Sequence, residues 1–505
     1  MKKKYVFSGL SILLAQPILA AKVLSRPNII FILCDDMGYG DLACYGQPYI
    51  RTPNIDRMAQ EGMRFTQAYA GAPVSAPSRA TLMTGQHTGH THVRGNKEYW
   101  KDAPCVMYGN NADYNVVGQE PYDPNHVILP EIFKSQGYHT ALFGKWAGGY
   151  ENSVSTPDKR GIDEFFGYIC QFQAHLYYPN FLNRYSKQMG DTSVVREVLQ
   201  KNVNYPMYGD GYKKRTQYSA NLIHEKAIEW IDQQDANHPF VGFFTYTLPH
   251  AELSQPDDSL VRYYEKEFFN DKTWGGQEGS RYNAVEHTHA QFAAMITRLD
   301  HYVGEILAKL KEKGLDQNTI VFFTSDNGPH EEGGADPAFF GRDGKLKGLK
   351  RQCYEGGIRV PFIAWGPGTI AQNTTNDLAF AFYDLMPTFC DMMGIKNYEK
   401  KYANKKFSDR FDGISIAPTL FGQDNLQNQH EYLYWEFSET DQIGVRKGDW
   451  KLVVIHGVPH LYNLSSDIHE DNDLSENYPE IVQNLTDAIK KEHVDNPEYP
   501  VTLPY

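Results

Sequence analysis

Four short stretches of continuous apolar residues constrain the fold of this chain more than any other feature of its sequence. They are residues 28–33, 138–143, 239–246 and 319–324. Each is too short for a typical buried helix and is bounded by turn-forming residues. Strands without polar alternation are buried on both faces, which is typical of parallel sheets covered by helices. We therefore expect an α/β fold with a large mixed, mostly parallel sheet flanked by helices, including helices near residues 222–231 and 286–313.

The pattern changes after about residue 425. Short apolar stretches then follow one another closely, separated by glycine turns, and a helical pattern closes the chain. The stretches are residues 432–437, 443–446, 450–455 and 460–463, with the helix at 480–492. We predict two domains, a large α/β domain over residues 22–425 and a small domain over 426–505 with an antiparallel sheet and one helix.

The first 21 residues have the composition of a secretory signal. Three lysines precede an apolar stretch over residues 5–19, and the small residues Ala20 and Ala21 follow. The apolar stretch is shorter than the ~20 residues that a stable membrane span needs. We therefore predict a signal peptide over residues 1–21, no membrane anchor, and an exported protein that is periplasmic or secreted.

The charge balance excludes one class of partner. The chain has 49 Lys and Arg against 62 Asp and Glu, a formal charge of −13. Binding of nucleic acid needs clustered basic residues, which the sequence lacks. An acidic chain can still hold a small anion in a locally basic pocket. The six cysteines show no metal-binding spacing, and their pairing stays open.

Acidic and amide side chains follow two of the expected strands. Asp35 and Asp36 come after the first strand, and Asp326 and Asn327 come after the last. Ligands bind at the carboxyl ends of parallel strands, so these side chains should meet at one edge of the sheet. Each pair alone is also typical of a turn. Together their oxygen ligands favour Ca²⁺ or Mg²⁺ over zinc.

Basic side chains are expected at the same edge. Lys145 and His250 follow the two other strands, and Ser75 and Arg79 belong to a Ser-Ala-Pro-Ser-Arg segment. Pro77 is well placed as the first residue of a short helix. Ser75 would then lie at the positive end of that helix, where an oxyanion is stabilised.

Ordered motifs along the chain resemble the type I sulfatase family of the alkaline phosphatase superfamily. They are residues 34–41, 52–56, 75–85, 144–146, 323–328 and 354–361, followed by 445–452 and 461–464. The resemblance covers nearly all of the expected mature chain. It implies an alkaline phosphatase-like fold and a sulfuric ester hydrolase.

The resemblance also implies how the residues act. In this family a Cys or Ser at the position of Ser75 is converted to formylglycine (3-oxoalanine), and Ser is typical of the route that uses a radical maturating enzyme. The hydrated aldehyde supplies the nucleophilic oxygen. Asp35, Asp36, Asp326 and Asn327 match the ligands of a calcium ion, which the oxygen at position 75 also contacts.

Further matches concern the sulfate and the leaving group. Arg79, Lys145 and Lys350 match the cations that hold the hydrate and the sulfate, and His250 matches the proton donor to the departing alcohol. The family usually has His after Gly-Lys-Trp, where this chain has Ala147. That His is thought to deprotonate the sulfated hydrate, so the resemblance leaves its replacement open.

Two groups of loop residues remain. Arg94, Asn96 and His175 lie in loops after the expected site elements and are candidates for contacts to a sugar. His87, His90 and His92 follow the Ser75 helix. Their spacing suggests a metal site, but carboxylates at zinc spacing are absent nearby, so we expect surface or rim positions.

The sequence therefore predicts an exported carbohydrate sulfatase that acts on a sulfated glycan, with exo-acting removal of sulfate from galactose or N-acetylgalactosamine as the first choice. One alternative is a phosphomonoesterase or phosphodiesterase of the same superfamily. Those enzymes commonly need a second metal with His ligands, and no such cluster is evident beside Asp326. The other alternative is a glycan-binding pseudosulfatase, which Ala147 and the need for modification of Ser75 suggest.

Overall fold

The computed structural model describes residues 26–100, 116–206, 209–276, 282–402 and 411–505. The predicted signal peptide at residues 1–21 lies outside these ranges and stays a prediction. No helix within the ranges is long and apolar enough to cross a membrane.

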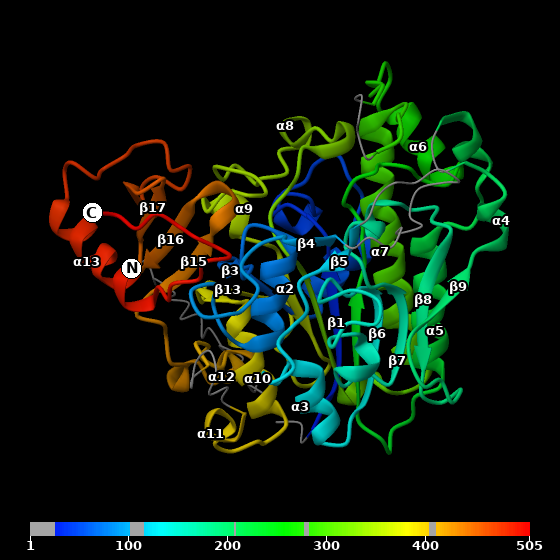
Figure 1. The fold of residues 1–505 in the computed structure, drawn as a ribbon, viewed down its shortest axis with the longest axis horizontal. Helices are drawn as coiled ribbons and strands as arrows, with labels where there is room; N and C mark the ends of the chain where they lie inside the picture. The colour runs from blue at the N-terminus through cyan, green and yellow to red at the C-terminus, as the bar shows by residue number, and fades with distance from the viewer. Residues whose placement is uncertain (1–25, 101–115, 207–208, 277–281, 403–410) are drawn as a thin grey trace, which may run out of the picture.

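A ten-stranded sheet forms the centre of the large domain in the described part of the chain (Figure 1). Its order is β13-β2-β12-β11-β1-β10-β6-β7-β8-β9, and the strands from β11 to β7 run parallel. The four apolar stretches of the sequence form four of these parallel strands. They are β1 (Asn28–Cys34), β6 (His139–Lys145), β10 (Phe240–Thr245) and β11 (Thr319–Ser325). The predicted mixed, mostly parallel sheet is confirmed.

The remaining strands extend this sheet or form small ribbons. The extensions are β2 (Met63–Phe65), β7 (Glu164–Tyr168), β8 (Phe181–Ser186), β9 (Val195–Val198), β12 (Phe362–Trp365) and β13 (Thr374–Asn376). The ribbons pair β3 (Ala68–Tyr69) with β14 (Phe380–Ala381), and β4 (Glu98–Trp100) with β5 (Val116–Gln119).

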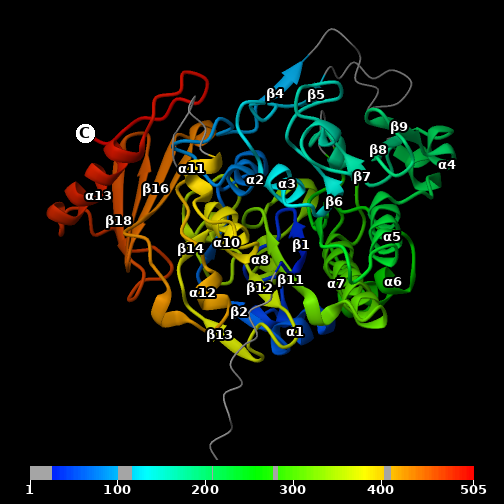
Figure 2. The ribbon, with the colours of Figure 1, turned by 90° about the horizontal axis from the view of Figure 1, so that it is seen from below.

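Helices cover both faces of the sheet (Figure 2). Along β1, Ile30 and Ile32 pack into one core, whereas Phe31 and Leu33 pack into the other. The first core includes residues of α1 (Pro53–Gln60), α5 (Ser219–Asp232), α6 (Ser259–Glu267) and α7 (Thr288–Glu312). The second includes residues of α2 (Ser75–Thr84), α3 (Leu129–Ser135), α10 (Leu385–Met392) and α12 (Ala417–Leu420). Short helices are α4 (Gln200–Val203), α8 (Pro337–Phe340), α9 (Glu355–Ile358) and α11 (Tyr398–Tyr402).

The end of the chain forms the predicted antiparallel sheet and helix. The sheet contains β15 (Leu433–Phe437), β16 (Gln442–Lys447), β17 (Trp450–Ile455) and β18 (Val458–Asn463), in that order. One face is covered by α13 (Pro479–Glu492), whose Leu485 and Ile489 join its core. The other face packs on the large domain, where the Trp435 indole N–H donates to the Ala70 carbonyl at 2.9 Å. The domain boundary after residue 425 stays a prediction.

Candidate active site

The acidic and amide groups predicted for one sheet edge come together there. Asp35 and Asp36 directly follow β1, while Asp326 and Asn327 directly follow the neighbouring β11, and all four are buried. The Asp36 backbone N–H donates to Asp326 Oδ1 at 3.1 Å, and Asn327 Nδ2 donates to Asp36 Oδ1 at 2.7 Å. The turns after the two strands therefore hold each other in place.

Ser75 points into this group from the start of α2. Its Oγ lies 2.9 Å from Asp35 Oδ1 and 3.4 Å from Asn327 Oδ1. The helix begins at Ser75, so the prediction that Pro77 is its first residue is wrong by two positions. Pro77 still lies in the first turn, where amide N–H groups have no partner within the helix and a missing N–H costs little.

Three cations neutralise the three carboxylates. Arg79 Nη2 lies 2.8 Å from Asp326 Oδ2, Lys145 Nζ lies 2.6 Å from Asp35 Oδ2, and Lys350 Nζ lies 2.8 Å from Asp36 Oδ2. All six side chains are at most 4% exposed, so water screens these pairs poorly. The six residues come from five separate segments of the chain.

These contacts change the pKa values of the carboxylates in opposite directions. Burial alone would raise the pKa of Asp35, but the ammonium of Lys145 and other nearby cations hold it well below its usual range. Burial and the neighbouring charge of Asp35 raise the pKa of Asp326. Carboxylates that lie this close together repel one another, and a bound cation would relieve this repulsion.

The donor set fits a hard divalent cation. The side chains that meet here offer the carboxylate oxygens of Asp35, Asp36 and Asp326, the amide oxygen of Asn327 and the hydroxyl of Ser75. All are oxygen donors, which suit Ca²⁺ and to a lesser degree the smaller Mg²⁺. The geometry is thus compatible with the predicted calcium ligands, whose role stays a prediction.

His250 lies beside the cations, as expected. Its Nε2 is 3.0 Å from Lys350 Nζ and 3.3 Å from Asp36 Oδ2. The ring of His175 stacks on it, with centroids 4.5 Å apart and planes 9° apart. Burial and the neighbouring His250 hold the pKa of His175 well below its ordinary value, so this ring stays neutral near pH 7.

A cavity of about 570 Å³ opens next to this centre. Its lining includes His175 and Lys350 from the large domain and Glu439, Glu498 and Tyr499 from the C-terminal domain. Both domains therefore shape the space in which a substrate would lie.

Two of the three loop residues predicted to contact a sugar line this cavity. They are Asn96 and His175. The Asn96 side chain also accepts from the Ala76 backbone N–H at 3.2 Å, which places it one residue from Ser75. Arg94 does not line the cavity. Its buried guanidinium donates to the Val494 carbonyl at 2.7 Å and contacts Glu436 at 3.4 Å, so its geometry does not support the predicted sugar contact.

Sequence reasoning missed several residues of the cavity. Glu332 lies 3.6 Å from Lys350 and 2.6 Å from Arg351, and it accepts from the Tyr282 hydroxyl at 2.8 Å. Glu332, Arg351 and Tyr282 do not directly follow a predicted strand. Glu439 and Glu498 belong to the C-terminal domain. No sequence signal connected them to the site.

Ala147 lies just beyond β6 and is buried. Its φ is +57°, in the left-handed region, and its backbone N–H donates to the Ile169 carbonyl at 3.3 Å. The methyl group can neither accept nor donate a proton. The open question about the group that replaces the usual His therefore concerns the neighbouring side chains.

Glu252 should make the stability of the protein depend on pH. It lies two residues after His250 and is fully buried, it accepts from Asn283 Nδ2 at 2.9 Å, and burial raises its pKa to about 7. Because the pKa of Glu252 is raised in the folded state, its contribution to stability is fully present at a pH below the ordinary carboxyl pKa of 4.5. That contribution falls by ~1.4 kcal/mol per pH unit as the pH rises from 4.5 toward the folded pKa of about 7, and it is lost above that pH.

We therefore expect Glu252→Gln to weaken the decline in stability between pH 5 and 8. Urea unfolding at both pH values should show that, between pH 5 and pH 8, the free energy of unfolding falls by ~3 kcal/mol more in the wild type than in the variant. Glu267→Gln on the exposed part of α6 is the matched control and should keep the wild-type slope. Equal slopes in wild type and Glu252→Gln would contradict the expectation.

Comparisons with known proteins agree with this arrangement. The family model described as Sulfatase matches residues 27–395, and the one described as N-sulphoglucosamine sulphohydrolase, C-terminal, matches residues 348–495. N-acetylgalactosamine-6-sulfatase of Rattus norvegicus is 32% identical over 422 residues, which span 81% of this chain and 69% of the rat protein. A sulfatase of Formosa agariphila is 29% identical and spans 97% of this chain and 92% of its own length.

Solved structures show the same fold. The crystal structure of Ps i-CgsB in complex with k-i-k-neocarrahexaose superimposes with a TM-score of 0.70 and 25% sequence identity. The match covers 95% of each chain, so it includes both domains.

Proposed function

Since the chain belongs to the sulfatase family and is a sulfuric ester hydrolase, we propose that it is an exported carbohydrate sulfatase that removes sulfate from sulfated glycans. The substrate is a sulfated galactose or N-acetylgalactosamine residue at the end of a chain. A radical maturating enzyme converts Ser75 to formylglycine, and Ca²⁺ is the bound metal.

The placement of Ser75 is the observation that carries this proposal. Its Oγ lies against Asp35 and Asn327 at the positive end of α2, with Arg79 one turn further along the helix. An unmodified hydroxyl is a weak nucleophile without an adjacent base. Ser75 Oγ contacts the carboxylate of Asp35 and the amide oxygen of Asn327. Asp35 is a poor base for this hydroxyl, because its pairing with Lys145 and other nearby cations holds its pKa well below the usual range. A hydrated aldehyde at this position would supply a second hydroxyl and a more acidic nucleophile.

The charges fit a sulfate ester. Three carboxylates balance three cations in the site, so a bound Ca²⁺ would make it positive, as a sulfate monoester requires. Calcium supplies electrostatic polarisation of oxygens in such a site. Arg79, Lys145 and Lys350 are placed to bind sulfate oxygens and to hold them against the group at position 75.

His250 lies where it can donate a proton to the leaving alcohol. Its Nδ1 contacts the Ala251 carbonyl, which favours the tautomer with the proton on Nδ1 and leaves Nε2 facing Lys350 and Asp36. Lys350 Nζ can transfer a proton to Nε2, because the two atoms are 3.0 Å apart. His250 and Lys350 together can therefore protonate an oxygen that leaves toward the cavity.

The cavity favours an uncharged sugar ring beyond the sulfate. Its rim carries the carboxylates of Glu98, Glu332, Glu439 and Glu498. Lys97 lies within ion-pair distance of Glu498, and Arg351 lies within ion-pair distance of Glu332. A second anionic group on the substrate would meet like charge here. The relative named N-acetylgalactosamine-6-sulfatase, and the solved complex with k-i-k-neocarrahexaose, are consistent with a carbohydrate substrate.

The phosphatase alternative has less support. His330 lies four residues after Asp326, within reach of Asp36 and Glu332, which sequence reasoning did not anticipate. However, its Nε2 donates to the Pro249 carbonyl and its Nδ1 accepts from the Glu332 backbone N–H, both at 3.1 Å. Both ring nitrogens are thus occupied, so the ring is not offered to a second metal. The pseudosulfatase alternative rests on Ala147 and on the need for Ser75 to be modified before the enzyme can act.

A panel of substrates tests the proposal. Matured enzyme with Ca²⁺ should release inorganic sulfate from at least one of the 3-, 4- and 6-sulfated forms of galactose and N-acetylgalactosamine. Addition of a carboxylate to the accepted sugar should lower kcat/KM by roughly 10-fold, because one unfavourable like-charge contact costs ~1.4 kcal/mol. Failure on every monosaccharide, with sulfate released only from longer chains, would contradict the exo-acting assignment.

A further inference from the structure

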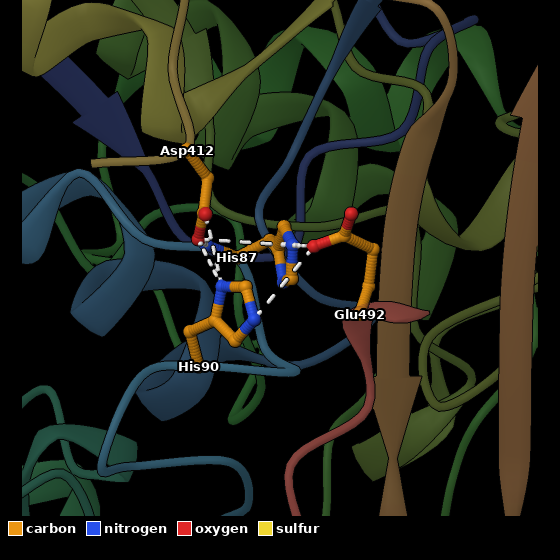
Figure 3. A group of neighbouring side chains, drawn as sticks. All are labelled: His87, His90, Asp412 and Glu492. Atoms are coloured by element: carbon orange, nitrogen blue, oxygen red, sulfur yellow. Dashed lines mark hydrogen bonds and ion pairs between the residues drawn. The ribbon is translucent and has the colours of Figure 1, made fainter. Parts of the chain in front are cut away.

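A second cluster of metal-ligating side chains lies between the two domains, away from the site above. It contains His87 and His90 from the loop after α2, Asp412 from the segment before α12, and Glu492 at the end of α13. Figure 3 shows their rings and carboxylates pointing toward one another. The rim position expected for these histidines is wrong, because both are buried between carboxylates that lie more than 300 residues away in the sequence.

The potential ligand atoms are close together. Glu492 Oε2 lies 3.4 Å from His87 Nε2 and 3.7 Å from His90 Nε2. Metal–ligand bonds of 2.0–2.1 Å in a tetrahedral zinc site place the ligand atoms roughly 3.3 Å apart. The observed spacing therefore needs only small side-chain shifts to accept an ion.

Asp412 is placed to orient one of the rings. His90 Nδ1 is 2.9 Å from both carboxylate oxygens of Asp412, which holds the His90 ring proton on Nδ1 and turns Nε2 toward Glu492. Asp412 also accepts from the His87 backbone N–H at 2.9 Å. A carboxylate that fixes the tautomer of a ligating His is a common feature of zinc sites.

The charge of the cluster calls for a cation. The four side chains are at most 6% exposed, and with neutral imidazoles they carry two negative charges. One divalent ion would neutralise both carboxylates.

The cluster is also reachable from solvent. An open cavity of about 200 Å³ is lined by His87, Asp412 and Glu492, together with Tyr432 and Lys491. An ion can therefore enter after folding.

We propose that His87 Nε2, His90 Nε2 and Glu492 Oε2 bind one divalent transition-metal ion such as Zn²⁺, with Asp412 orienting His90. Mixed imidazole and carboxylate donors distinguish this site from the all-oxygen centre at Asp35 and favour zinc over calcium. Binding moves the His87 ring proton to Nδ1, so the Gly89 backbone N–H gives up the 3.1 Å hydrogen bond that it donates to that atom.

Such an ion would join the C-terminal domain to the active-site helix. Ser75 is the first residue of α2, and His87 and His90 follow the last residue of the same helix. Glu492 is the last residue of α13. The ion would thus link α13 to the loop after α2 and stabilise the contact between the domains that form the cavity.

Metal uptake by untagged protein tests the proposal. Protein treated with a chelating resin is mixed with Zn²⁺ or Co²⁺ in excess Ca²⁺, so that calcium competes for the oxygen site, and is then desalted. Elemental analysis should find one equivalent of zinc, and Co²⁺ should give the visible absorption of a tetrahedral site. The thermal midpoint should rise with Zn²⁺.

Variants locate the bound ion. His87→Ala/His90→Ala should lower zinc uptake at least 10-fold and lose the cobalt spectrum, and Glu492→Gln should weaken uptake in a chain that keeps both histidines. The matched control is His238→Ala/His456→Ala, which removes two exposed histidines that each lie beside one aspartate and should bind like the wild type. Zinc uptake that is equal in the wild type and both cluster variants, or no uptake by the wild type, would overturn the proposal.

Discussion

Ser75→Ala is expected to lower kcat/KM for sulfate release by roughly 10⁴-fold or more, the scale of loss when an enzyme loses its nucleophile. Alanine has no hydroxyl that could be oxidised to the aldehyde. The change removes a side chain with contacts at 2.9 and 3.4 Å and creates no buried charge, so the fold should persist. Steady-state assays on the accepted sulfated sugar, with far-UV circular dichroism of the same sample, give the result.

Two further variants separate chemistry from structure. Ser78→Ala removes another hydroxyl of the same helix, which accepts from the Gly71 backbone N–H at 3.1 Å, and should cost ~1 kcal/mol of stability with activity within 10-fold. Ser75→Cys should regain activity in a host whose maturating enzyme accepts Cys. Residual activity above one tenth in matured Ser75→Ala would contradict a role for the group at position 75 as nucleophile.

Asp35→Asn has the second-largest expected effect, because Asp35 contacts both Ser75 and Lys145. The amide keeps the shape of the side chain but removes one carboxylate from the oxygen donor set. It also leaves the Lys145 ammonium, 1% exposed and 2.6 Å away, without its partner charge. Loss of one member of a buried ion pair costs about 3 kcal/mol or more. We expect ~100-fold or greater loss of activity and weaker calcium binding.

The matched control for this variant lies between the domains. Glu355→Gln breaks an equally buried pair, in which Glu355 Oε1 lies 2.8 Å from Lys451 Nζ and both side chains are 0% exposed. Its free energy of unfolding in urea should fall by a similar amount. Its calcium binding, measured by calorimetry on chelator-treated protein, should be retained. Equal calcium affinity in wild type and Asp35→Asn would contradict the assignment of Asp35 as a ligand.

The centre of the fold could be predicted because each parallel strand is a local signal. Residues 320–323 are all apolar, since β11 is buried on both faces, and the same pattern holds for residues 29–33 of β1. Once the strands are known, the rule that parallel strands end at one edge brings Asp35 and Asp326 together without further information. The start of α2 was misplaced by two residues because proline is tolerated throughout the first turn.

What the sequence did not reveal depends on contacts between segments that are far apart in the chain. Arg94 is held by Glu436 and by the Val494 carbonyl, and His90 is held by Asp412. These partners are more than 300 residues away and carry no motif that links them to the loop after α2. Long-range packing of this kind follows from the assembled fold, and local patterns do not encode it.

The mass of the peptide that contains Ser75 tests the central claim most directly. In protein purified from a host with the radical maturating enzyme, oxidation of the hydroxymethyl group to an aldehyde makes that peptide lighter by two hydrogens. We predict this loss at Ser75 in the sample that releases sulfate, and an unmodified peptide in the inactive protein made without the maturating enzyme. A fully active sample in which Ser75 is unmodified would contradict the account.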